Sequence, residues 1–167
     1  DFDNDGLDDL FFAGNLVDDK IYKNLGNLKF QDKTPNSGIV NDNSWSTGVT
    51  VADVNNDGLL DIYVSCELYD DHPKLRTNKL YINKGNFKFD ELAAKWNVDV
   101  DRRTRHAVFF DYNKDGLLDL YLLNHPPNTG NFSPFLGTDM KLPEYNLQLF
   151  ENKEGFFEDV TSKAGLD

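Results

Sequence analysis

Three short stretches of the chain carry acidic side chains at one fixed spacing. Each has Asp or Asn at its first, third and fifth positions, Gly at its sixth and Asp at its ninth. Loop 1 begins at Asp1, loop 2 at Asp53 and loop 3 at Asp111. Calcium takes about 6–8 oxygen ligands at about 2.3–2.6 Å, and short side chains on alternate residues can converge on one ion. The pattern therefore predicts three calcium sites.

The three loops supply equivalent ligand sets. Side chains at positions 1, 3, 5 and 9 would offer their oxygens, and position 7 would offer its main-chain carbonyl. Gly at position 6 permits the positive φ that folds the loop back on itself. The predicted metal ligands are Asp1, Asp3, Asp5, Leu7 and Asp9 in loop 1, Asp53, Asn55, Asp57, Leu59 and Asp61 in loop 2, and Asp111, Asn113, Asp115, Leu117 and Asp119 in loop 3.

Other interpretations of these loops fit less well. An EF-hand requires a bidentate Glu at position 12 and flanking helices, whereas position 12 is Phe12, Val64 or Leu122, each inside an expected strand. Magnesium demands strict octahedral geometry, and zinc favours His or Cys, which no loop contains. Plain polar turns would not repeat all five positions in register three times.

The segments around the loops predict β-strands. Short β-branched and aromatic runs enter and leave the loops, at 50–52, 61–65, 108–110 and 118–123. A second motif then follows each loop, with Asn24, Asn83 or Asn152 before a Gly-containing turn. Four short strands per repeat, several apolar on both faces, predict an all-β fold and a β-propeller of four-stranded blades. We expect one partial propeller over 1–167, with repeats at about 1–47, 48–105 and 106–167.

These motifs together resemble a known repeat family. Asp-x-Asp/Asn-x-Asp-Gly-x-x-Asp before an apolar strand is similar to the FG-GAP/VCBS repeats of integrin-α-like β-propellers. The Asn-x-Gly motif and the segment from Phe157 to Thr161 resemble the subgroup often linked to an ASPIC/UnbV domain. The resemblance implies calcium ligands at the positions named above. It also implies that the chain supplies about three blades of a seven-bladed propeller, with the remaining blades as partners.

The connections predict a partner-binding face. Turns of a four-stranded meander alternate between the two ends of the sheet, so the acidic loops and Asn-x-Gly turns share one face. The length variation, at 13–20, 66–79 and 124–148, falls on the other face. Aromatic and Arg side chains are common anchors of recognition surfaces. The predicted partner-binding residues are Tyr69, His72, Arg103, His125, Phe132, Phe135 and Tyr145. Alternatively, the long loops pack on themselves, and Trp45 and Trp96 fill the core between blades.

Charge and composition exclude several classes of function. The formal net charge of −12 argues against nucleic acid as a partner, and no apolar run is long enough for membrane insertion. Ten of the 29 acidic residues are predicted ligands, so three calcium ions would halve the net charge. No nucleophile elbow, P-loop or HExxH motif is present, and we expect a protein that is not an enzyme.

The resulting expectation is a calcium-binding module, secreted or at the cell surface, for adhesion or recognition of an extracellular protein or glycan. Extracellular calcium modules bind with Kd of about 10⁻⁴–10⁻³ M, which cytosolic calcium would not saturate. One alternative is the propeller portion of a secreted carbohydrate-active lyase or hydrolase. Another is a structural spacer.

Overall fold

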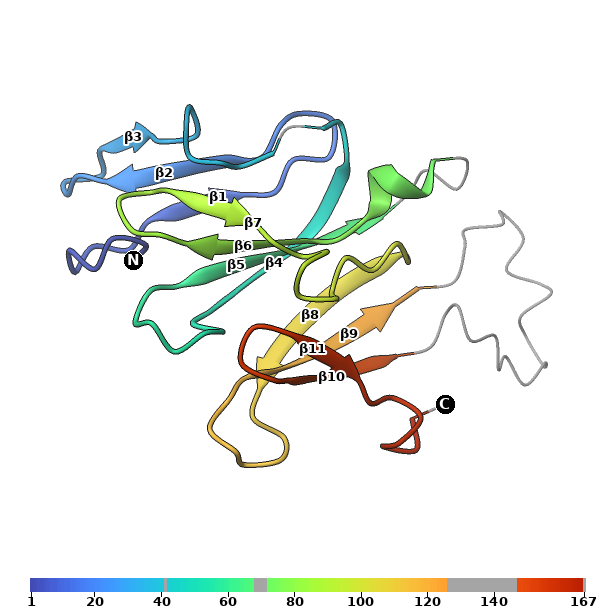
Figure 1. Cartoon of the computed structure of the whole chain (residues 1–167). Coiled ribbons are helices and arrows are strands. Elements are labelled where there is room, and N and C mark those ends of the chain that lie inside the picture. Colours follow the sequence, from blue (N-terminus) through green and yellow to red (C-terminus); the bar gives the residue numbers. More distant parts are fainter. Residues whose placement is uncertain (41, 68–71, 126–146, 167) are drawn as a thin grey trace.

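The computed structural model describes residues 1–40, 42–67, 72–125 and 147–166, and these residues form three antiparallel sheets (Figure 1). Blade 1 contains β1 (Leu10–Phe12), β2 (Lys20–Asn24) and β3 (Phe30–Asp32). Blade 2 contains β4 (Trp45–Ala52), β5 (Asp61–Glu67), β6 (Lys79–Asn83) and β7 (Phe89–Glu91). Blade 3 contains β8 (Thr104–Phe110), β9 (Asp119–Asn124), β10 (Gln148–Asn152) and β11 (Phe157–Asp159).

Each sheet is a meander in which strands that follow one another in sequence pair side by side. Blades 2 and 3 have the predicted four strands, and blade 1 has three. The one helical segment among the described residues is the short 3₁₀-helix η1 (Pro73–Arg76). None of these residues forms a helix with the length and apolar character of a membrane span. The predicted all-β fold of propeller-type blades is therefore confirmed, as an arrangement of three sheets that does not close into a ring.

Apolar side chains fill the two spaces between successive blades. Phe2, Ile21, Ile62 and Phe87 belong to a buried cluster between blades 1 and 2. A second cluster, between blades 2 and 3, contains Tyr63, Leu80, Trp96, Leu120 and Phe157. Every residue of β5 and β6 is buried. Burial on both faces explains why apolar and polar residues do not simply alternate along these strands.

Trp96 belongs to the protein interior. It is 7% exposed, and its ring centroid lies 5.9 Å from that of Phe157 in blade 3. The main-chain N–H of Phe157 also donates to the Trp96 carbonyl at 2.9 Å. Trp96 therefore joins blades 2 and 3, as in the alternative that assigned it to the inter-blade core.

The two ends of the sheets carry different structures. Loops 1–3 and the β2–β3, β6–β7 and β10–β11 hairpins lie at one end, which we call the loop face (Figure 1). η1 lies at the opposite end, which we call the connection face (Figure 1). The acidic loops and the Asn-x-Gly turns therefore share one face, as the meander topology predicted.

Candidate metal centre

Each acidic loop closes on its first carboxylate. In loop 1, the main-chain N–H of Asp5 donates to Asp1 Oδ1 at 3.1 Å, and that of Gly6 donates to Asp1 Oδ2 at 2.7 Å. Asp53 and Asp111 accept the equivalent pairs of bonds, at 2.8–3.1 Å. The carboxylate at position 1 thus holds the loop folded by accepting bonds from the main chain at positions 5 and 6.

The carboxylate at position 9 joins the loop to the Asn-x-Gly motif. Asp61 accepts main-chain bonds from Val54, at 3.0 Å, and from Asn83, at 2.8 Å. The equivalent bonds reach Asp9 from Phe2 and Asn24, and Asp119 from Tyr112 and Asn152. Loop and hairpin are therefore one hydrogen-bonded unit in every blade.

Glycine at position 6 is required by the backbone. Gly6, Gly58 and Gly116 have φ of +86°, +84° and +88°, a region that side chains with a Cβ disfavour. A Cβ added at any of the three would meet no heavy atom within 4 Å. The requirement for Gly is thus one of conformation and not of space, as the sequence predicted.

Loop 1 brings three carboxylates to one point. One oxygen from each of Asp1, Asp3 and Asp9 lies within 4.8 Å of the others, a separation that fits oxygens around a single calcium ion. Asp3 Oδ1 is shielded from solvent and has no hydrogen-bond partner. A buried oxygen without a donor is costly, and a hard cation would satisfy it. The donor set of loop 1 therefore fits calcium.

Loops 2 and 3 share the backbone network of loop 1 but carry Asn at position 3. Asn55 Nδ2 donates to Asp57 Oδ2, and Asn113 Nδ2 donates to Asp115 Oδ2, both at 2.9 Å. The ligand candidates at positions 3 and 5 are therefore in direct contact in both loops. Within the described residues, Asp1, Asp3 and Asp9 form the one group of three close carboxylates.

The loops concentrate negative charge. Burial raises the pKa of Asp61 to about 6, and the carboxylates of Asp57 and Asp53 act in the same direction, against the two main-chain bonds. Burial likewise raises the pKa of Asp119, with Asp115 and Asp111 adding to the rise. A bound cation would favour the charged carboxylates.

Asn83 and Asn152 link neighbouring blades through their side chains. Asn83 Nδ2 donates to the carbonyl of Leu60 in its own blade, at 3.0 Å, and to that of Phe2 in loop 1, at 2.9 Å. Asn152 Nδ2 repeats this pattern, with bonds to the carbonyls of Leu118 and Val54. The sequence showed the repeated Asn but not this role.

A second link joins the loops directly. Asn4 Nδ2 in loop 1 donates to the carbonyl of Gly58 in loop 2, at 2.9 Å. Asn56 in loop 2 donates in the same way to Gly116 in loop 3, at 3.3 Å. Successive acidic loops are therefore connected to each other as well as to their own blades.

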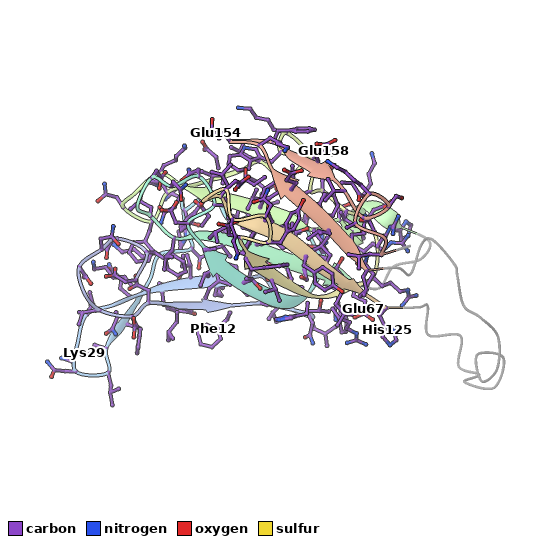
Figure 2. All side chains as sticks on the ribbon, turned by 90° about the horizontal axis from the view of Figure 1, so that it is seen from below. Phe12, Lys29, Glu67, His125, Glu154 and Glu158 are labelled. Carbon is purple, nitrogen blue, oxygen red and sulfur yellow. The ribbon has the colours of Figure 1, made fainter. Side chains whose placement is uncertain are left out.

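The predicted partner-binding residues have mixed positions. Tyr69, Phe132, Phe135 and Tyr145 lie outside the described residues. His72 is exposed and His125 half-buried. Arg103 is 8% exposed, and its Nη1 lies 3.9 Å from Glu67 Oε1, so it stabilises the structure beneath the connection face. Figure 2 shows Glu67 and His125 at one end of the sheets and Lys29, from the β2–β3 hairpin, at the other.

Comparison with known families agrees with this geometry. The three meander sheets and their repeated loops define a propeller-type repeat protein, and residues 1–64 match the family model of the FG-GAP-like repeat. Residues 1–64 therefore carry an FG-GAP-like repeat, in agreement with the predicted family, while the ASPIC/UnbV-associated subgroup stays a prediction. No curated protein gives a significant match to the chain.

Proposed function

We propose that this protein is a calcium-binding β-propeller module that binds an extracellular protein or glycan and performs no catalysis. Three Ca²⁺ ions would bind, one to each of loops 1–3, through the side chains at positions 1, 3, 5 and 9 and the carbonyl at position 7. The ions would neutralise loop carboxylates and hold the loop face rigid. The connection face would then meet the partner.

The observation that carries the calcium proposal is the solvent-shielded, unpartnered Oδ1 of Asp3 beside the carboxylates of Asp1 and Asp9. Two further loops share the main-chain network that shapes this cluster. A polar turn needs none of these oxygens to converge. A calcium site needs all of them to do so.

The proposed location and partner rest on the family and on charge. FG-GAP repeats are typically extracellular, where millimolar calcium would saturate sites with Kd of about 10⁻⁴–10⁻³ M. On the connection face, the described charged groups include the Glu67 carboxylate, whose Oε2 lies 3.0 Å from Arg105 Nε. The contact is an ion pair in which Oε2 accepts no hydrogen bond from the described residues, and the pairing of this carboxylate with a guanidinium favours a structural or binding role over acid–base catalysis.

Thermal unfolding in buffers that differ only in their divalent cation tests the proposal. We expect a melting temperature that rises with calcium, since a ligand at tenfold excess over Kd adds about 1.4 kcal/mol per site. Magnesium at equal concentration is the control and should stabilise the protein less, because it demands octahedral geometry. An identical melting temperature in chelator and in calcium would refute the metal assignment.

A further inference from the structure

The residue before each motif Asn differs between the blades, and in blades 1 and 3 its side chain contacts the acidic loop of its own blade. In blade 1 it is Lys23, in blade 2 Ile82 and in blade 3 Glu151. Lys23 Nζ donates to Asp3 Oδ2 and, at 2.7 Å, to Asp5 Oδ2. Its ammonium thus contacts two predicted ligands of loop 1 at once.

Loop 1 also differs from the others in its own charge. It has Asp3 where loops 2 and 3 have Asn55 and Asn113, so its predicted ligand positions carry one more carboxylate than theirs. Lys23 is bonded to that additional carboxylate. With the ammonium included, the ligand side chains of loop 1 have the same net charge as those of the Asn-containing loop 2.

Blade 3 shows the same compensation with other residues. Glu151 adds a carboxylate beside loop 3, where its Oε1 accepts a bond from Asn113 Nδ2 at 3.2 Å. Lys153 Nζ lies 2.5 Å from the same Oε1 and offsets its charge. In blade 2, Ile82 is 1% exposed and lies in the apolar core, so no charge is added there.

We propose that Lys23 is the internal counter-ion of loop 1. In calcium-free protein its ammonium stabilises the Asp3 and Asp5 carboxylates, and in calcium it competes with the ion for them. Lys23 thereby sets the calcium affinity of loop 1 below the value that its four carboxylates would otherwise give. This inference rests on the proposed calcium function.

Replacing Lys23 with Met tests the proposal because Met keeps an unbranched stem and removes the charge. In chelator, we expect the melting temperature of Lys23→Met to fall by about 2–4 °C, since two partly exposed ion pairs are lost. In saturating calcium, the difference should disappear or reverse. Isothermal titration calorimetry should show one site with about tenfold tighter calcium binding, because a like charge a few ångström from the ion is removed.

Lys33 provides a matched control. Its Nζ lies 6.0 Å from the centroid of the Phe87 ring, and Lys23 Nζ lies 5.8 Å from the same ring. Lys33→Met therefore removes the same charge from the same aromatic contact but breaks no bond to loop 1. It should leave calcium affinity within about twofold of the wild type, because its charge is separated and screened.

The double variant Asp3→Asn with Lys23→Met gives blade 1 uncharged residues at the two positions where blade 2 has Asn55 and Ile82. It should bind calcium with near wild-type affinity, whereas Asp3→Asn alone should bind about tenfold more weakly. Equal affinities for wild type, Lys23→Met and Lys33→Met would overturn the role of Lys23 while leaving the calcium function intact. Absence of calcium binding by the wild type would overturn both.

Discussion

Replacing Asn83 with Ala should destabilise the protein far more than the same change at Asn24, although both occupy the same position of the repeat. The Asn83 side chain is fully buried. It bonds to the carbonyls of Phe2 and Leu60 and accepts the Gly85 N–H at 2.8 Å. Three hydrogen bonds at about 1 kcal/mol each, with buried groups left unpaired, give a loss of about 3 kcal/mol.

Asn24 is the matched control because it is half-buried and lacks the inter-blade bond among the described residues. Its Nδ2 donates to Asp8 O in an exposed position, and its Oδ1 accepts from Gly26 N. Asn24→Ala should therefore cost about 1 kcal/mol. Urea unfolding followed by circular dichroism measures both values. Equal losses for the two variants would refute the inference that Asn83 joins blades 1 and 2.

Three other changes have defined outcomes. In chelator, lowering the pH from about 7 to 5 should raise the free energy of unfolding by about 1 kcal/mol from Asp61, whose pKa burial raises from 3.8 to about 6. A raised folded-state pKa gives stability that is complete below the unfolded-state pKa and is lost as the pH rises through 6. Urea unfolding at a series of pH values would contradict this expectation if the free energy of unfolding rose between pH 5 and 7. Gly58→Ala should cost about 1–2 kcal/mol through its φ of +84°, and Gly58→Asn should cost less in the same assay. Trp96→Ala should cost about 3–5 kcal/mol as a core truncation, whereas a loss below about 1 kcal/mol would indicate a surface residue.

The repeated features of this protein were the ones that could be predicted from its sequence. Gly6, Gly58 and Gly116 share a positive φ because the same tight loop recurs. The positive φ favours Gly at position 6 each time, so the repeat is visible in the sequence. The strands leaving the loops were predictable for the same reason. Apolar residues on both faces of β5 indicated a sheet covered on both sides, and the structure buries that strand completely.

Contacts between blades could not be predicted from the repeats. The Phe2 carbonyl that accepts from Asn83 lies 81 positions away in the chain, and a main-chain acceptor leaves no residue-type signal. The role of Lys23 could not be predicted from the repeat, because the aligned residues, Ile82 and Glu151, have unrelated side chains. Arg103 was predicted as a partner-binding residue; it is 8% exposed and pairs with Glu67 of the preceding blade, a contact that spacing alone does not reveal.

The most direct test of the calcium account is a crystal structure of the protein grown in about 10 mM calcium, a tenfold excess over the weakest expected Kd. An anomalous difference map should show three peaks, one in each of loops 1–3. Each peak should lie about 2.3–2.6 Å from oxygens at positions 1, 3, 5, 7 and 9. Loops that keep water or a lysine ammonium in place of the ion at this concentration would contradict the central claim.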